Sequence, residues 1–291
     1  MLALVTSSAA AGIDPDLPPL LAAFEAELGG GVASVEHWDD PDVDWARFDA
    51  ALVRSTWDYV RDLDGFLDWT SRVAPVSSLH NAPDVIRWNS DKRYLLALAG
   101  AGIDTVPTHV VPPGRAPPPT HGDTVVKPTV GAGSRGARRC ATSAEVAAHV
   151  AVLHRAGSTA MIQPYVGPIE EHGESALCFL PGPGGGLEYS HAFSKSAILA
   201  GDGPQWDGDL VAREEVTALE PTSDQLALAR RVLGAAAAVV GPLAYARVDV
   251  VPGPRTPLLM ELELIEPSMY FDLAPGSARR AAARWAASMT P

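Results

Sequence analysis

Two short segments near the C-terminus constrain most strongly what this chain can fold into. Residues 245–251 and 259–264 are rich in apolar and β-branched side chains, and the proline-rich residues 252–257 between them predict a turn. Together they predict a β-hairpin. Because alternate side chains of a strand point to the same face, we expect the charged residues of both strands on one face. These residues are Arg247, Asp249, Glu261 and Glu263.

Three carboxylates on one face of a hairpin predict a metal site. Carboxylates that lie close together repel each other unless a cation sits among them. Mg²⁺ prefers such oxygen ligands and typically uses one or two carboxylates together with substrate phosphates. The alternative for Glu261 and Glu263 alone is the solvated face of an amphipathic strand. The partner strand carries Arg247 and Asp249 at the same two-residue spacing, so their side chains can lie on the same face as the two glutamates. This arrangement favours the metal site.

The composition and charge favour a soluble enzyme. The 291-residue chain has a formal net charge of −13, whereas binding to nucleic acid or an anionic membrane would favour a basic surface. Met1–Thr6 lacks a basic region and predicts a first strand instead of a signal peptide, and no apolar run is long enough to span a bilayer. Cys140 and Cys178 do not suggest a disulfide framework. We therefore expect a cytoplasmic protein without nucleic acid or membrane partners.

The pattern along the chain predicts an α/β protein. In the first ninety residues, strand-like and helix-like segments alternate, which is typical of parallel βαβ units. Asn89–Asp91 offers an N-cap for a helix from Lys92 to about Leu98. A proline-rich loop at 112–119 precedes further strands and helices, and a polar loop is expected near 201–209.

Residues 131–136 form a glycine-rich segment, G-A-G-S-R-G, which formally matches the dinucleotide-binding pattern G-x-G-x-x-G. A dinucleotide site should lead directly into a helix and carry an acidic residue about 20 positions later. Here the helical pattern begins only after Thr142 and Ser143, no suitable acid follows, and a Walker A motif is absent. We interpret the segment as a flexible hairpin whose N–H groups can fold over phosphates, with a plain β-turn as the alternative. Lys127, which ends an apolar strand just before it, favours phosphate binding.

The order and spacing of these features over residues 87–268 resemble the ATP-grasp superfamily, which contains carboxylate–amine ligases. The resemblance implies ATP and Mg²⁺ as cofactors and a three-lobed ATP-grasp fold of mixed α/β class. Its lobes would be an N-terminal Rossmann-like lobe with a parallel sheet (1–86), a small central lid lobe (87–165) and a C-terminal lobe with an antiparallel sheet (166–291).

The resemblance also implies roles for individual residues. Those expected to contact ATP are Lys92 and Lys127 at the phosphates, Gly131, Gly133, Ser134 and Gly136 in the mobile loop, Gln163, Pro164, Tyr165 and Val166 at the adenine, and Glu170 or Glu171 at the ribose. Those expected to bind magnesium are Asp249, Glu261 and Glu263, although the superfamily often has Asn at the last position. Arg247 is expected at the γ-phosphate or acyl phosphate.

Lys195 is assigned a compensating role. Many superfamily members carry Asp-x-Arg after the linker, whereas this chain has Glu174-Ser175-Ala176. Lys195 is therefore expected to supply the missing positive charge near the phosphates. The alternative is that Lys195 is a solvated residue leading into the loop at 196–209.

Three further motifs resemble the D-cycloserine synthetase branch of the superfamily, which uses ATP to close a ring in O-ureido-D-serine. They are R-S-T-W-D-Y at 54–59, N-S-D-K-R-Y at 89–94 and E-L-E-L-I-E-P-S at 261–268. This resemblance implies a small, amino-acid-like substrate. The residues expected to bind it are Arg54, Ser55, Thr56 and Tyr59 in the first lobe, and Glu266, Ser268 and Tyr270 after the metal strand. The alternative for the first-lobe segment is a capped strand–loop–helix junction. Trp57 could form a wall of the pocket, but we interpret it as a core residue.

The implied chemistry is activation of a carboxylate as an acyl phosphate, followed by attack of a nitrogen from the same substrate. Two alternatives remain. An intermolecular amino-acid or peptide ligase would need a second amine substrate. A nucleotide-binding module without catalysis would need neither the acidic residues nor Arg247, so their presence disfavours it. A homodimer is compatible with each of these functions.

Overall fold

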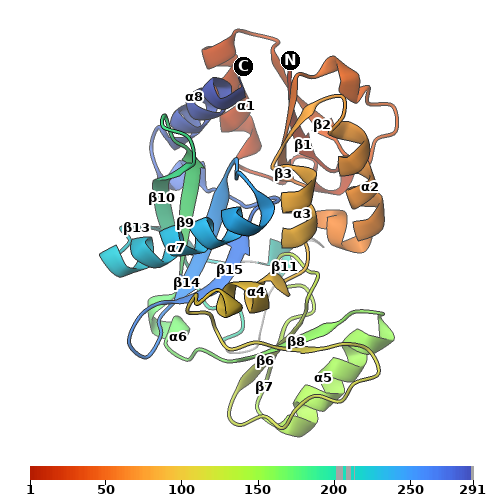
Figure 1. Ribbon diagram of the computed structural model, residues 1–291, viewed down its shortest axis with the longest axis vertical. Helices are drawn as coiled ribbons and strands as arrows, with labels where there is room; N and C mark the ends of the chain where they lie inside the picture. Colours follow the sequence, from red (N-terminus) through yellow and green to blue (C-terminus); the bar gives the residue numbers. More distant parts are fainter. Residues whose placement is uncertain (201–205, 208–210, 213, 290–291) are drawn as a thin grey trace.

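The computed structural model describes residues 1–200, 206–207, 211–212 and 214–289. Within them, three sheets of four or five strands and their helices form an elongated molecule (Figure 1). β11 (Trp206–Asp207) pairs with β12 (Val211–Ala212), and the rest of the polar loop expected near 201–209 lies outside the described residues. In the described part, no helix is long and apolar enough to cross a membrane.

The first sheet is parallel, with the strand order β2-β1-β3-β4. Its strands are β1 (Leu2–Thr6), β2 (Ala33–His37), β3 (Ala50–Ser55) and β4 (Ser78–His80). Leu2 and Leu4 share a core with α1 (Leu17–Leu28), whereas Ala3 and Val5 face the opposite side and share a core with α2 (Leu63–Val73). This burial on both faces explains the almost continuous apolar sequence of β1. The predicted Rossmann-like lobe is confirmed.

The central sheet is small and antiparallel, with the order β5-β8-β6-β7. Its strands are β5 (His109–Val111), β6 (Thr124–Pro128), β7 (Arg138–Cys140) and β8 (Ala160–Pro164). α5 (Ser143–Arg155) packs on one face, and the Thr142 side chain caps it by accepting the Glu145 backbone N–H. The helix therefore starts after β7, separated from the glycine-rich loop as the sequence pattern predicts.

The C-terminal sheet is antiparallel, with the order β13-β10-β9-β14-β15. Its strands are β9 (Glu174–Pro181), β10 (Leu187–Lys195), β13 (Val216–Leu219), β14 (Ala246–Val251) and β15 (Leu258–Glu263). α7 (Ser223–Val240) covers one face. α8 (Ser277–Met289) covers the other and also packs on α1, where Trp285 stacks on Phe24 at 6.2 Å between ring centroids. The last lobe and the first therefore share a core.

Two short helices connect the first lobe to the central one. They are α3 (Pro83–Asn89) and α4 (Tyr94–Gly100), and Lys92 lies between them. The predicted helix from Lys92, capped at Asn89–Asp91, is therefore wrong in its start. Asn89 ends α3, and its side chain donates to the Leu262 carbonyl and accepts the Leu264 N–H, both at 2.8 Å, so it is used by the backbone beside β15.

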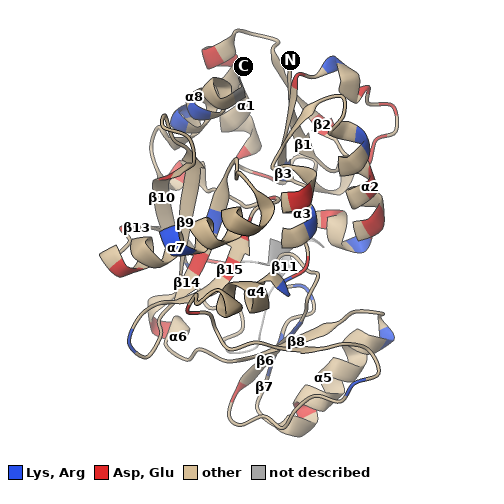
Figure 2. Cartoon of the chain, viewed as in Figure 1, with Lys and Arg blue, Asp and Glu red and all other residues tan. Residues whose placement is uncertain are grey.

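The predicted hairpin at 245–264 is confirmed. β14 and β15 pair antiparallel in a register that places Arg247 opposite Glu263 and Asp249 opposite Glu261. Acidic segments of both strands lie where the large upper body meets the small central sheet (Figure 2). The remaining short elements are α6 (Ile169–His172) and the 3₁₀ helices η1 (Ser8–Ala10), η2 (Trp45–Arg47), η3 (Trp57–Arg61) and η4 (Phe271–Leu273).

Candidate active site

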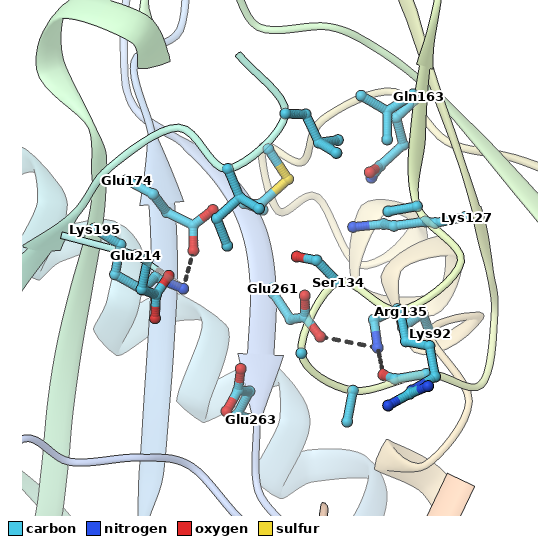
Figure 3. A pocket seen from close by; sticks show the side chains of 18 of the residues that line it. Lys92, Lys127, Ser134, Arg135, Gln163, Glu174, Lys195, Glu214, Glu261 and Glu263 are labelled. Atoms are coloured by element: carbon cyan, nitrogen blue, oxygen red, sulfur yellow. Dashed lines mark hydrogen bonds and ion pairs between the residues drawn. The ribbon is translucent and has the colours of Figure 1, made fainter. Parts of the chain in front are cut away.

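A pocket lies between the central sheet and the C-terminal sheet, and η3 of the first lobe contributes to its wall. Figure 3 shows the lysines of one wall, Lys92 and Lys127, facing Glu174 and Lys195 across it, with Glu261 between them. The predicted residues that line this pocket are Tyr59, Lys92, Lys127, Gly131, Gly133, Ser134, Gln163, Pro164, Tyr165, Val166, Lys195, Arg247, Glu261, Glu263, Glu266, Ser268 and Tyr270. Sequence positions 200 residues apart thus meet in one site.

Two lysines stand beside the glycine-rich loop. The Lys92 ammonium donates to the Gly131 carbonyl and lies 3.0 Å from a carboxylate oxygen of Glu261. Lys127, on β6, has no hydrogen-bond or ion-pair partner among the residues the structure describes, and burial together with nearby Lys92 lowers its pKa. Lys127 is thus a half-buried cation that an anionic ligand would stabilise.

The glycine-rich loop follows β6 with backbone conformations that side chains rarely adopt. Gly133, Ser134 and Gly136 have positive φ angles of 56°, 59° and 73°. A Cβ at Gly131 would come within 3.1 Å of the Pro128 ring. Gly136 does not line the pocket, since it packs near Pro128 and Leu153 at the base of the loop. Its predicted contact with phosphate is therefore corrected to a structural role in the turn.

Arg247 holds the acidic face of the hairpin together. Its guanidinium donates two bonds of 2.8 Å to Asp249, a third bond to Glu263 and a fourth, of 3.0 Å, to the Ser268 carbonyl. Lys195 donates to Asp249 at 2.6 Å and also pairs with Glu174. Burial alone would raise the pKa of Asp249, but the two cations outweigh it and lower that pKa.

The other pocket carboxyl groups are less well compensated. Burial raises the pKa of Glu263 to about 7, although Arg247 opposes the change. Burial likewise raises the pKa of Glu174 to about 7 against the effect of Lys195. A ligand that brings positive charge, or that lets these groups share a cation, would therefore be favoured near neutral pH.

The pocket carboxylates can serve as oxygen ligands of a magnesium ion. Among the described residues, no three His, Cys, Asp or Glu side chains lie close enough together to hold a metal by themselves. Glu261 and Glu263 nevertheless line the pocket as oxygen donors, and two carboxylates with substrate phosphates suffice for Mg²⁺. Asp249 does not line the pocket and is engaged by Arg247 and Lys195. The donor set fits the metal with Glu261 and Glu263 as its pocket-facing members.

The two glutamates predicted at the ribose lie elsewhere. Glu170 accepts from Arg139 at 2.6 Å and from the Tyr165 hydroxyl at 2.9 Å, and neither Glu170 nor Glu171 lines the pocket. Both are on α6, which turns away after the linker. Glu174, the first residue of β9, lines the pocket instead. Its position as the first strand residue after the linker was the available sequence signal.

In the first lobe, the predicted substrate residues before η3 lie outside the pocket, whereas Tyr59 within η3 lines it. Arg54 is 1% exposed, and its guanidinium donates to the Pro267 carbonyl at 2.8 Å, while Ser55 Oγ lies 2.8 Å from Thr6 Oγ1. Arg54, Ser55 and Thr56 do not line the pocket, so their predicted contact with substrate is not supported by the geometry.

Trp57, interpreted as a core residue, lines the pocket together with Tyr59. Its Nε1 donates to the Glu266 carbonyl at 3.1 Å. The reason is local: β3 ends at Ser55, and the 3₁₀ turn that begins at Trp57 carries the chain toward the segment after β15. The interpretation of Trp57 as core is corrected.

Comparison with known proteins gives a consistent result. Residues 2–81 match the family described as D-cycloserine synthetase DcsG, N-terminal domain. The cycloserine biosynthesis protein DcsG of Streptomyces lavendulae is 38% identical over 307 residues, covering 100% of this chain and 99% of that protein. The crystal structure of D-cycloserine synthetase DcsG matches with a TM-score of 0.88 and 35% identity over 99% of each chain.

A more distant structure shares the fold. It is the ATP-grasp ligase PsnB, solved with a phosphomimetic variant of its minimal precursor, Mg and ADP; it matches with a TM-score of 0.60 and 15% identity, covering 99% of this chain and 98% of that one. The full-length relative and the shared fold agree. The chain therefore belongs to the D-cycloserine synthetase DcsG family and has the fold of the ATP-grasp ligases.

Proposed function

We propose that this enzyme uses ATP and Mg²⁺ to activate the carboxylate of O-ureido-D-serine and closes it to D-cycloserine in the cytoplasm. The reaction consumes water and releases ADP and phosphate, and the carbamoyl group of the substrate leaves as carbon dioxide and ammonia. The observation that carries the proposal is the full-length match to DcsG, a protein named for cycloserine biosynthesis. The pocket supports it, because its walls combine lysines, a mobile-loop sequence and carboxylates as phosphoryl transfer requires.

ATP would lie along the central sheet. Lys127 offers an uncompensated ammonium for the phosphates, and Lys92 ties the glycine-rich loop at Gly131 to the same region. The linker at 163–166 lines the pocket next to β6 and is proposed to contact adenine through its backbone. Glu174 is proposed at the ribose hydroxyls in place of Glu170 and Glu171.

Magnesium would be held by Glu261 and Glu263, with Asp249 as the third proposed ligand once Lys195 and Arg247 turn toward phosphate. When bound, it neutralises charge on the transferring phosphoryl group. Arg247 is proposed to steady the phosphoryl group of the acyl phosphate, and Lys195 to add positive charge. Their present partners, Asp249 and Glu263, hold both cations at the pocket wall in advance.

Ring closure follows from the geometry of one bound substrate. The attacking nitrogen and the activated carboxyl carbon belong to the same molecule, so binding in a folded conformation replaces an encounter between two molecules. The loop at 131–136 is proposed to close over the phosphates and exclude water, which would otherwise hydrolyse the acyl phosphate.

The test is Mg²⁺-dependent release of ADP and phosphate with O-ureido-D-serine, with its L-enantiomer, and with pairs of free amino acids. Turnover with the D-compound and no added amine, with D-cycloserine as product, is expected. Turnover only with paired amino acids would replace the proposal by an intermolecular ligase. The alternative of a non-catalytic nucleotide-binding module is already overturned by membership of a synthetase family.

A further inference from the structure

The charged residues of the pocket are almost all engaged with one another. Lys92 pairs with Glu261, Arg247 with Glu263, and Lys195 with Glu174. Glu214 accepts from the Tyr270 hydroxyl at 3.1 Å. Glu266 differs from these carboxylates, because its side chain has no hydrogen-bond or ion-pair partner within the described ranges of the chain. The Glu266 carboxylate therefore lacks a cationic partner among the described residues.

Glu266 lies at the end of the pocket that the first lobe closes. Its backbone carbonyl accepts the Trp57 Nε1–H, and its carboxylate is the first charged group that acts on the buried Tyr59 hydroxyl. Lys92 and Arg247 also act on Glu266, but Lys92 is already bonded to Glu261 and Gly131, and Arg247 already pairs with Asp249 and Glu263. Because these two cations are engaged elsewhere, a cation brought by a ligand would match Glu266.

Two further oxygens line the same pocket without a partner in the described part of the structure. They are the Tyr59 hydroxyl, whose residue is only 4% exposed, and the Ser268 hydroxyl; the Ser268 carbonyl is used by Arg247. An ammonium group has three N–H donors and no acceptor. One carboxylate and two hydroxyl oxygens provide the three acceptors that it needs.

The electrostatics of the ligand-free pocket agree with this chemistry. Burial, reinforced by the Glu263 carboxylate, raises the pKa of Glu266 well above its usual range. Such a group gains most from a nearby cation, because the cation offsets the desolvation of its charged form. An anionic or neutral group at this end of the pocket would leave that cost uncompensated.

We propose that Glu266, assisted by the hydroxyls of Tyr59 and Ser268, binds the α-ammonium group of the substrate. The inference rests on the proposed function, in which the substrate is an amino acid, and deepens it by requiring that the α-amino group be free. It also fixes the substrate's orientation: the ammonium lies toward η3, and the carboxylate to be activated lies toward Arg247. N-acylated and des-amino analogues should be rejected.

Direct binding provides the test. The affinities of D-serine and of 3-hydroxypropanoate, which lacks the ammonium group, are measured by calorimetry with Mg²⁺ and a non-hydrolysable ATP analogue. The wild-type enzyme is expected to prefer D-serine by roughly 10- to 100-fold, the effect of one charge-assisted contact in a buried site. In Glu266→Gln this preference should fall below about threefold, whereas Glu266→Asp should keep most of it.

Two controls make the result specific. Glu188→Gln changes an exposed carboxylate that pairs with Arg284 outside the pocket, and should keep the full preference. An unchanged affinity of Glu266→Gln for the ATP analogue shows that the pocket is intact. An unaltered preference for D-serine in Glu266→Gln, or no such preference in the wild type, would overturn the ammonium site.

The failure of the proposed reaction gives a different result. If O-ureido-D-serine is not turned over, the proposed function falls, but the binding preference of wild type and Glu266→Gln still decides the ammonium site. If O-ureido-D-serine is turned over, its KM should rise in Glu266→Gln by the same factor as the lost preference, while the KM for ATP stays constant. Turnover with an unchanged KM in that variant would reject this site alone.

Discussion

The β14–β15 hairpin and the segment from Arg54 to Tyr59 both contribute to one pocket, yet they place their charged side chains differently. On the hairpin, Arg247, Glu261 and Glu263 face the pocket because strand alternation places them there. In the first lobe, Arg54 is buried outside the pocket, and Trp57 and Tyr59 line the pocket instead. Regular secondary structure thus exposes its charged residues predictably, whereas a strand-to-turn junction does not.

The largest expected effect is on the hairpin side. Glu261→Gln removes a pocket carboxylate that is proposed to bind magnesium, and kcat should fall about 1,000-fold. The rate of ADP release at saturating Mg²⁺ and ATP measures it, with Glu188→Gln as the matched change outside the pocket. Near-normal turnover in Glu261→Gln would remove Glu261 from the metal site.

Arg54 tests the other side of the comparison. Arg54→Met deletes a buried guanidinium that donates to the Pro267 carbonyl and opposes the rise that burial causes in the pKa of Asp14. The unfolding free energy should therefore drop by about 3 kcal/mol. Urea denaturation measures this, and exposed Arg61→Met should change it by less than about 0.5 kcal/mol. Unaltered stability with a raised KM for the amino acid would return Arg54 to substrate binding.

Lys127 separates ATP binding from substrate binding. Lys127→Met removes the pocket ammonium that has no described partner, and the KM for ATP should rise roughly 10- to 100-fold with little change in the KM for the amino acid. Steady-state kinetics with each substrate varied in turn make the distinction, and Arg155→Met, at the end of α5, serves as the control. Equal changes in both KM values would contradict the separation.

The raised pKa of Glu263, about 7, predicts a pH dependence. Because the ionised carboxylate is the metal ligand, the affinity for Mg²⁺·ATP should rise roughly tenfold from pH 6 to pH 8. In the ligand-free protein, the raised pKa of Glu263 makes the free energy of unfolding depend on pH in the opposite sense. The stabilisation that Glu263 contributes is fully present below about pH 4.5 and is lost as the pH rises through 7. Titration calorimetry at both pH values checks the affinity, and Glu263→Gln should lose the dependence that Glu263 causes.

The smallest effect is expected at Trp57. Trp57→Phe keeps an aromatic ring in the pocket wall but removes the bond to the Glu266 carbonyl, so the KM for the amino acid should rise about threefold while the KM for ATP stays constant. Trp45→Phe, a change in the first-lobe core, should alter neither value. An unaffected KM for the amino acid in Trp57→Phe would mean that the ring only fills space.

Much of the site could be predicted from local patterns. The alternation of β14 and β15, the apolar strand before Lys127 and the glycines after it all act over a few residues, and the structure places these residues around one pocket. The lobe boundaries at 86/87 and 165/166 remain predictions. The first falls inside α3, and the second falls one residue beyond the end of β8.

The predicted roles of Asn89, Glu170 and Glu171 differ from the structure because the role of each side chain depends on backbone that is distant in the sequence. Asn89 is a favourable helix-cap residue by its type, but its amide bonds to the backbone of Leu262 and Leu264, more than 170 positions away. Glu170 and Glu171 sit on a four-residue helix that turns them from the pocket, and Glu174 takes the position beside Lys195. None of these partners is visible from local spacing.

The sequence by itself indicated the α/β class, the acidic hairpin and the two lysines beside the glycine-rich segment, because strand periodicity and turn residues act over short distances. The three-lobed fold followed from the resemblance to the ATP-grasp superfamily. Only the tertiary structure decided which charges are already paired and which are left for a ligand. Pairing depends on side chains from separate lobes meeting in a low-dielectric site, as Lys92 meets Glu261 while Glu266 meets none in the described part of the chain. Contacts between residues that are distant in the sequence produce no local sequence pattern. These contacts determine which charged groups of the pocket remain unpaired and can bind a charged group of the substrate.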